Sequence, residues 1–98
     1  MYARVSDVTA PADRIDDGIA QYRDGVLPQI MGMDGFVRAY LLVDRDAGKA
    51  LSVTVWDSAE AMQASADAAA TLRSQVTDAM SGQSDVSGYE VVISEGAG

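Results

Sequence analysis

The fold of this 98-residue chain is decided by one stretch, Phe36-Val37-Arg38-Ala39-Tyr40-Leu41-Leu42-Val43, which is followed after a short turn by Ala50-Leu51-Ser52-Val53-Thr54-Val55-Trp56. Both runs are rich in the β-branched and aromatic residues that favour strands. The connecting residues 44–49 are polar and include Gly48, which can adopt a positive φ. The sequence therefore predicts a β-hairpin.

The register of this hairpin follows if Val43 lies opposite Ala50. The cross-strand pairs are then Leu42 with Leu51, Tyr40 with Val53, Arg38 with Val55, and Val37 with Trp56. Since successive side chains alternate between faces, one face is predicted to carry Phe36, Arg38, Tyr40, Leu42, Leu51, Val53 and Val55, and the other Val37, Ala39, Leu41, Val43, Ser52, Thr54 and Trp56.

Both faces of the predicted hairpin are largely apolar. One layer of helices covers only one face of a sheet and leaves the other in water. A chain of this length also buries well under three quarters of its unfolded surface. The simplest cover for the second face is the same face of another copy, so the sequence predicts a homodimer.

The segments before the hairpin predict a strand and an amphipathic helix. The strand covers Tyr2–Val8 and is broken at Pro11. Apolar residues then recur at helical spacing, and Pro28 is expected to kink or shorten the last turn. The predicted buried stripe consists of Ile15, Ile19, Tyr22, Val26 and Ile30.

A second helix and a last strand are predicted after the hairpin. Ser58 is placed to cap the helix, and Gly82 is expected to take a positive φ at its end. A connector rich in serine, glycine and aspartate then runs to Gly88, and Tyr89–Ser94 is the predicted strand. The apolar positions of the helix are Met62, Ala66, Ala69, Leu72 or Arg73, Val76 and Met80.

The order strand, helix, strand, strand, helix, strand is that of a ferredoxin-like split βαβ domain. The expected fold class is therefore α+β with a four-stranded antiparallel sheet. We expect a single domain over residues 1–95 and a flexible tail over residues 96–98.

Composition excludes several classes of function. Seven Lys and Arg against 15 Asp and Glu give a net charge of −8, the wrong sign for binding nucleic acid or an anionic membrane. The absence of cysteine and histidine removes disulfides, thiolate nucleophiles, and imidazole as a base or metal ligand. With no export signal and no apolar run long enough to cross a bilayer, we expect a cytoplasmic protein.

The turn Gly32-Met33-Asp34-Gly35-Phe36 and the junction Thr54-Val55-Trp56-Asp57-Ser58-Ala59-Glu60-Ala61-Met62 resemble the antibiotic biosynthesis monooxygenase superfamily. This resemblance implies a dimeric α/β barrel, in which two four-stranded sheets meet face to face with the helices outside. It also implies a pocket in each subunit between helices and sheet. The family includes quinone-forming oxygenases, haem-degrading enzymes and members with no assigned reaction.

The haem-degrading branch resembles this chain at the same junction, but carries a tryptophan early in the second helix and a histidine one or more turns later. Counted from Trp56, these places fall near Ser65 and Gln75. Serine lacks the ring and glutamine cannot replace the axial imidazole. Haem degradation is therefore disfavoured, and no cofactor is expected.

Two aromatic residues are candidates for contact with a substrate. By resemblance to the cofactor-free oxygenases, which hold flat polycyclic substrates with aromatic groups, Trp56 is one. An indole at a strand end is more often a packing anchor, because the burial of the ring alone accounts for it. Tyr22 lies on the predicted buried stripe and can place its hydroxyl in the pocket, or pack with the hydroxyl reaching water.

Three more candidates lie on strands. Arg38 interrupts an apolar strand, which indicates either an anion contact or a solvated arginine at a sheet edge. Tyr40 shares its face and the same two alternatives. Arg4 alternates with Ser6 and can point into the pocket. The acidic residues Asp13, Asp16 and Asp17 are instead interpreted as a solvated first helical turn and not as a metal site.

Two functions remain open from the sequence. The first is a cofactor-independent monooxygenase acting on a small aromatic, polyketide or quinol-type molecule, whose own electron-rich anion reacts with oxygen once it is bound and oriented. No general base is evident. The alternative is a non-catalytic dimeric module of the same fold, which binds a small apolar ligand or is purely structural.

Overall fold

The computed structural model describes residues 1–96. Four strands and two helical segments follow one another in the predicted order. The elements are β1 (Tyr2–Thr9), the 3₁₀ turn η1 (Ala12–Arg14), α1 (Ile15–Gln21), the π-helical turn η2 (Tyr22–Val26), α2 (Leu27–Met31), β2 (Phe36–Asp44), β3 (Lys49–Trp56), α3 (Ala59–Ala64), α4 (Ala66–Met80) and β4 (Gln83–Glu90).

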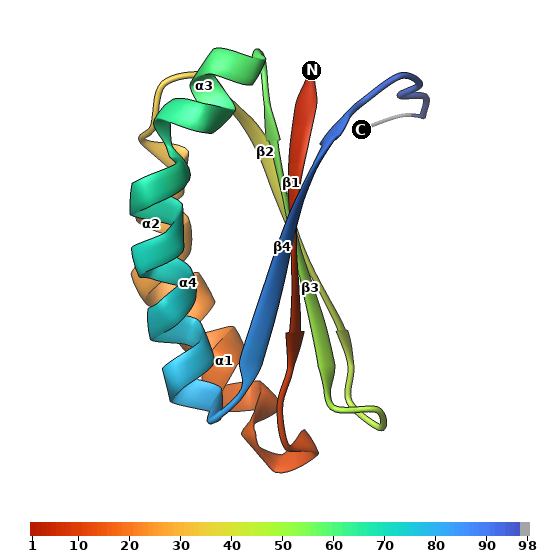
Figure 1. Ribbon diagram of the computed structural model, residues 1–98. Helices are drawn as coiled ribbons and strands as arrows, with labels where there is room; N and C mark the ends of the chain where they lie inside the picture. Colours follow the sequence, from red (N-terminus) through yellow and green to blue (C-terminus); the bar gives the residue numbers. More distant parts are fainter. Residues whose placement is uncertain (97–98) are drawn as a thin grey trace.

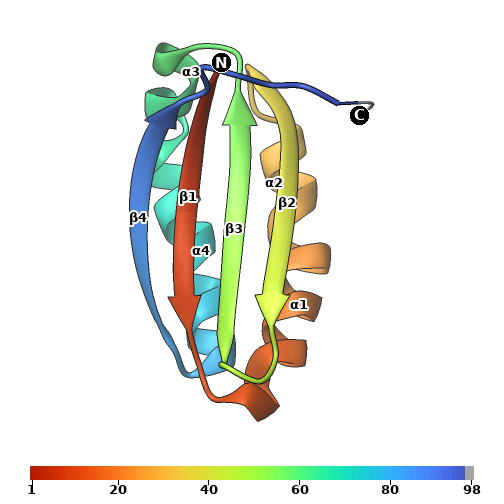
Figure 2. The ribbon, with the colours of Figure 1, turned by 90° about the vertical axis from the view of Figure 1, so that its right-hand side faces the viewer.

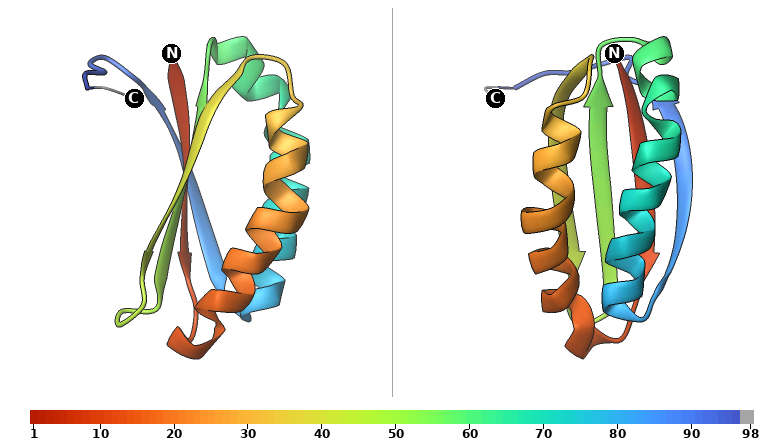
Figure 3. Two further views of the ribbon diagram at one scale, coloured as in Figure 1. Left: turned by 180° about the vertical axis from the view of Figure 1, so that it is seen from behind. Right: turned by 90° about the vertical axis from the view of Figure 1, so that its left-hand side faces the viewer.

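The strands form one sheet in the order β2-β3-β1-β4, and every neighbouring pair is antiparallel. All helices lie against the same face of this sheet, as Figure 1 and the left view of Figure 3 show. The right view of Figure 3 places α1 and α2 beside α4 over the sheet. The predicted ferredoxin-like α+β fold is confirmed.

The hairpin formed by β2 and β3 has the predicted register over most of its length. Val43 pairs with Ala50 and Arg38 with Val55, and the predicted pairs between these two are also present. The predicted pair of Val37 with Trp56 is wrong, because a β-bulge between Phe36 and Arg38 places Phe36 opposite Trp56. A bulge inserts one extra residue and so changes the face of everything beyond it. Phe36 therefore packs edge-on against Trp56 on the helix side, with ring centroids 5.9 Å apart.

Of the two predicted effects of Pro28, a kink or a shortening, the shortening is wrong, because the first helical segment runs to Met31. The turn before Pro28 widens instead, and the Leu27 N–H donates to the Tyr22 carbonyl five residues earlier. This wide turn relieves the clash that a proline ring makes with the carbonyl four residues before it. It also keeps both Tyr22 and Val26 buried against the sheet.

The second helical segment is divided at Ser65 into α3 and α4. The predicted cap is confirmed, since the Ser58 hydroxyl accepts a hydrogen bond from the Ala61 N–H at 3.1 Å. The positive φ at the end of α4 belongs to Ser81, at 53°, and not to Gly82 as predicted. Gly82 is needed for close approach, because a Cβ there would lie 2.4 Å from the Thr9 carbonyl oxygen.

The last strand, β4, begins six residues earlier than predicted and ends at Glu90. Its residues 83–88 were predicted to be a connector, but they pair with Thr9 to Arg4 of β1. Ladder hydrogen bonds to a buried neighbouring strand override the low β-propensity of serine, glycine and aspartate at an exposed edge. The predicted strand residues Val91–Ser94 have no regular structure. A flexible tail was predicted over residues 96–98, of which residues 97 and 98 lie outside the described part of the chain.

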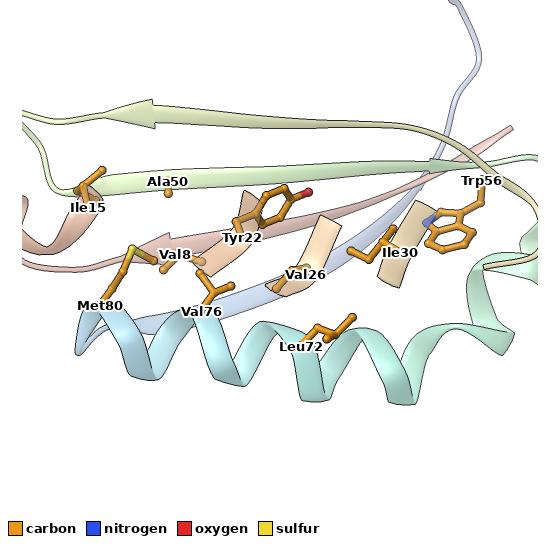
Figure 4. Packing of buried hydrophobic residues seen from close by; sticks show 10 residues of the cluster. All are labelled: Val8, Ile15, Tyr22, Val26, Ile30, Ala50, Trp56, Leu72, Val76 and Met80. Carbon is orange, nitrogen blue, oxygen red and sulfur yellow. The ribbon is translucent and has the colours of Figure 1, made fainter. Parts of the chain in front are cut away.

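The core lies between the sheet and the helices, as the close view in Figure 4 shows. The sheet contributes Val8, Ala50 and Trp56, and α4 contributes Leu72, Val76 and Met80. Among residues 1–96, no helix is long and apolar enough to cross a membrane.

The opposite face of the sheet has no helices over it, as Figure 2 shows. We call it the uncovered face. The register and the alternation of side chains assign to it Ala3, Val5, Asp7, Arg38, Tyr40, Leu42, Leu51, Val53, Val55, Asp85, Ser87 and Tyr89. The segment that follows β4 crosses one end of this face, and its Val92 and Ile93 are each 79% exposed.

Candidate functional site

A small cavity lies between the helices and the sheet, in the position that the sequence resemblance implied. Its volume is about 40 Å³. The apolar part of the wall comes mainly from Tyr22, Val26, Ile30, Ala69 and Val76, and the polar part from Arg4, Ser6, Ser52, Thr54 and Arg73. An engineered cavity of about 150 Å³ binds benzene. The cavity as it stands therefore holds a carboxylate-sized group, and a ring enters only if side chains move.

Three hydroxyl groups of the cavity wall are held by hydrogen bonds from neighbouring side chains. The Tyr22 hydroxyl accepts from Ser52 Oγ at 3.2 Å. Ser6 Oγ accepts from Arg73 Nε at 3.0 Å, and Thr54 Oγ1 accepts from Trp56 Nε1 at 3.0 Å. These bonds fix the orientation of each group before any ligand binds.

Arg4 is the most buried charged residue of the wall, with 8% of its surface exposed. Its Nη1 donates to Ser65 Oγ at 3.2 Å and its Nη2 to the Met62 carbonyl, at the break between α3 and α4. Its guanidinium carbon lies 5.6 Å from the centre of the Trp56 ring, a cation–π distance. Burial lowers the pKa of Arg4, and the positive charge of Arg73 lowers it further.

Arg73 reaches the same cavity from α4 and is half-buried. Burial lowers the pKa of its guanidinium as well. Within residues 1–96 neither Arg4 nor Arg73 forms an ion pair. The cavity wall thus carries two positive charges and contains no aspartate or glutamate.

The structure brings together two of the five residues predicted to contact a substrate. Arg4 and Tyr22 both line the cavity. Trp56 is fully buried next to it, where it contacts Arg4 and Thr54 without lining the wall. The packing role weighed for Trp56 is therefore present in the structure.

Arg38 and Tyr40 lie on the uncovered face, away from the cavity. The Arg38 guanidinium donates to the Tyr40 hydroxyl at 3.3 Å. They line an open groove of about 510 Å³, together with Met1, Val55, Val91, Ser94, Glu95 and Gly96. The five predicted residues are thus divided between the two faces of the sheet.

Sequence reasoning missed several members of the wall. Arg73 is predicted on the helix stripe as an alternative to Leu72, and in the structure Leu72 is buried and Arg73 half-buried. A cation within a stripe of buried positions was the signal that could have identified it. Ser52 and Thr54 alternate with apolar residues on β3, a pattern that marks their face but not their role.

The residues present do not fit a haem group or a metal ion. The chain has no histidine, and Ser65, near the place of the expected tryptophan, holds Arg4. In the described part of the chain no three acidic side chains converge. Asp16 and Asp17 form exposed ion pairs with Arg45 and Arg14.

Comparison with known protein families gives one match. Residues 1–77 match the family model described as antibiotic biosynthesis monooxygenase. Among curated proteins, the uncharacterized protein Rv2557 of Mycobacterium tuberculosis is 37% identical over 91 residues, which are 93% of this chain and 41% of that protein. Rv2558 of the same organism is 33% identical over 93 residues, 95% of this chain and 39% of that protein. The chain spans about two fifths of the length of these relatives.

Solved structures show the same fold at low sequence identity. The heme-degrader MhuD of Mycobacterium tuberculosis, with two hemes in its active site, superposes with a TM-score of 0.77 at 21% identity and covers 98% of this chain and 100% of its own. A monooxygenase of Streptomyces coelicolor (ActVA-Orf6) bound to nanaomycin D gives 0.74 at 18%, covering 99% and 92%. The cofactor-independent oxygenase SnoaB of Streptomyces nogalater gives 0.66 at 17%, covering 95% and 94%.

Proposed function

Because the chain belongs to the antibiotic biosynthesis monooxygenase family, we propose that it binds a small aromatic molecule of polyketide or quinol type between its helices and its sheet, and oxidises it without a cofactor. The cavity with one apolar side and a cluster of oriented polar groups carries this proposal. Ligand sites are typically apolar pockets with a few convergent polar groups. Two solved structures of the same fold are described as a monooxygenase and a cofactor-independent oxygenase.

The proposed reaction needs little from the protein. Once an anthrone-type substrate has lost a proton, its electron-rich anion transfers an electron to oxygen directly. One oxygen atom then replaces the two hydrogens of the ring CH₂ group, and the other leaves as water, so the substrate supplies all the electrons. The chain has to orient the ring, exclude water and stabilise the anion. Tyr22 and Arg73 lie where an oxygen of the substrate would be held.

A route for the ring into the cavity is offered by a second, more open pocket of about 210 Å³ between α3, α4 and β4. Arg4 lines both pockets and so forms a shared wall. The other residues of the outer pocket include Met62 and Gly88, and Met62 is an unbranched side chain that changes rotamer readily. We infer that a substrate enters past Met62.

The alternative is a binding protein of the same fold with no reaction of its own. One observation favours it: the cavity wall contains no carboxylate or imidazole that could act as a base near neutral pH. Under this alternative the aromatic molecule binds at the same place and is released unchanged.

Oxygen uptake with a panel of anthrones and quinols separates the two functions. We expect the wild-type chain to raise uptake above the rate without protein, and Tyr22→Phe to lower that increment about 100-fold, the usual effect of losing one hydrogen-bond donor to a developing anion. Tyr2→Phe, on β1 and outside the cavity wall, is the matched control and should leave uptake unchanged. Binding without uptake would favour the alternative. Neither binding nor uptake would overturn the proposal.

The uncovered face supports a homodimer. It presents Leu42 with 52% and Tyr89 with 57% of their surface exposed, while the centre of the face is formed by Val5, Leu51 and Val53. A contiguous apolar face of this kind marks an interface. Since the helices lie on the other side, two copies can pack sheet to sheet with both cavities on the outside.

Sedimentation at micromolar concentration tests the dimer. The wild-type chain is expected at twice its mass of 10.3 kDa, and Val53→Lys at the single mass, because a second copy would bury the new charge. Ala70→Lys introduces the same charge on the exposed side of α4 and should leave the dimer intact. A well-folded wild-type monomer at this concentration would refute the dimer.

A further inference from the structure

The ion pairs of this chain do not follow the burial of its arginines. Arg23 and Arg45 are exposed and Arg14 is half-buried, and each pairs with an aspartate at 2.7–2.9 Å. Exposed pairs of this kind contribute little to stability. Arg4 is buried and Arg73 is half-buried in the cavity wall, and within residues 1–96 they meet only neutral acceptors.

A charge removed from water is normally paired, because its desolvation is otherwise uncompensated. Here a buried and a half-buried charge of the same sign share one cavity wall, in a chain that has 15 acidic residues from which a partner could have come. The proximity of Arg73 further disfavours the charged form of Arg4, in addition to the effect of burial. An anionic group between them would offset both effects at once.

We propose that Arg4 and Arg73 form a site for the anionic group of the ligand: a carboxylate, or an ionised phenol or enol oxygen, of an aromatic molecule. This site rests on the function proposed above and gives it a substrate class. Neutral aromatic molecules of the same shape are poor ligands.

The geometry leaves donors for such a group. A guanidinium has five N–H groups, of which Arg4 uses two and Arg73 one in bonds to protein. Guanidinium groups match the planar fork of a carboxylate. The space available, about 40 Å³, accepts the carboxylate itself with Arg4 and Arg73 in place. Once side chains move, a ring would extend along the apolar side formed by Val26 and Val76.

Both guanidinium groups are also positioned in advance. Arg4 is held by the Ser65 hydroxyl and the face of Trp56, and Arg73 by the Ser6 hydroxyl. A site that is already ordered loses little conformational entropy when it binds. Arg73 is the better residue to substitute. Arg4 also connects β1 to the break between α3 and α4 by its hydrogen bonds to Ser65 and Met62, so its loss would disturb the fold.

The test uses two pairs of probes that differ in charge and not in shape: acetate with acetamide, and 2-naphthoate with 2-naphthamide. The ¹⁵N–¹H resonances of the arginine Nε–Hε groups report binding at each arginine of the full chain, at pH 7.5 and matched ionic strength. We expect both carboxylates to shift the signals of Arg4 and Arg73 and leave that of Arg45 in place. Calorimetry should give naphthoate an affinity at least tenfold above that of naphthamide.

Three variants complete the design. Arg73→Gln keeps a donor for Ser6 and removes the charge, so it should abolish the preference for naphthoate over naphthamide. Arg73→Lys should keep part of it. Arg45→Gln removes an equal charge on the turn between β2 and β3, where the partner is Asp16, and should bind like the wild type.

The outcomes separate this site from the proposed function. Acetate binding that depends on Arg73 supports the anion site. If neither naphthalene compound binds, the proposed function, the binding of an aromatic molecule, is refuted while the anion site stands. Equal, Arg73-independent affinities for naphthoate and naphthamide would overturn the anion site and leave the aromatic pocket standing. If none of the four probes shifts the Arg73 signal, the anion site is overturned.

Discussion

Replacing Trp56 with alanine is expected to lower the free energy of unfolding by about 3–5 kcal/mol, the usual cost of removing a large aromatic residue from a core. Trp56 has no exposed surface. Its loss would leave a cavity beside Phe36, remove the hydrogen bond to Thr54 and take the aromatic face away from Arg4. Urea denaturation followed by circular dichroism measures the effect as a lower midpoint at an unchanged slope.

Trp56→Phe is the control for that substitution, because it keeps an aromatic ring against Phe36 and removes the indole N–H. We expect it to cost less than half as much as alanine. Both variants have to be compared with the wild type at one protein concentration, since dimerisation would contribute to apparent stability. A loss below about 1 kcal/mol for Trp56→Ala would contradict the described packing of the core.

Replacing Gly48 with alanine is expected to cost about 2–3 kcal/mol. Gly48 has a φ of 67°, where a residue with a Cβ loses about 1–2 kcal/mol. A Cβ there would also lie 2.3 Å from the Ala10 carbonyl oxygen. That oxygen belongs to the backbone and can move only with the chain, which would strain the hydrogen bond from the Ala10 N–H to the Gly48 carbonyl and cost about 1 kcal/mol more.

The matched control is Gly32→Ala. Gly32 has a φ of −86° at the end of α2, and the nearest atom to a Cβ there is 3.7 Å away. Alanine at this position should change stability by less than about 0.5 kcal/mol, as is usual for a substitution outside special backbone positions. If the two variants unfolded at the same urea concentration, the close contact between the hairpin turn and the residues after β1 would be refuted.

The fold could be predicted to the extent that side-chain patterns determine it. The apolar runs of the hairpin set four of its cross-strand pairs, and the spacing of Ile15, Tyr22 and Val26 identified the buried side of the first helix. The bulge at Val37 could not be predicted, because no residue there requires it and the packing of Phe36 against Trp56 decides it.

The prediction of the last strand was wrong because local β-propensity did not decide where that strand lies. Residues 91–93 have the stronger β-propensity, yet residues 83–90 form β4, because pairing along the whole of β1 contributes more than local preference. A strand at the edge of a sheet needs few apolar residues of its own. Sequence reasoning that weighs only local composition therefore places such a strand too late.

The candidate site was predictable in part. Arg4 and Tyr22 were identified because each lies on an element with one buried face, and the structure places both on the cavity wall. Arg38 and Tyr40 could not be separated from them, since a sequence does not state which face of a two-faced sheet the helices cover. The approach of Arg73 to Arg4 depends on the contact of α4 with β1, made by the hydrogen bond from Arg73 to Ser6, and such a tertiary contact has no local signal.

The central claim is that the ligand site lies between the helices and the sheet. A crystal structure of the chain with 1,8-dihydroxyanthrone tests it most directly. We predict the rings between α4 and the sheet, with an oxygen of the ligand within hydrogen-bonding distance of Tyr22 or Arg73. Rings bound instead in the groove beside Arg38 and Tyr40, on the uncovered face, would contradict the claim.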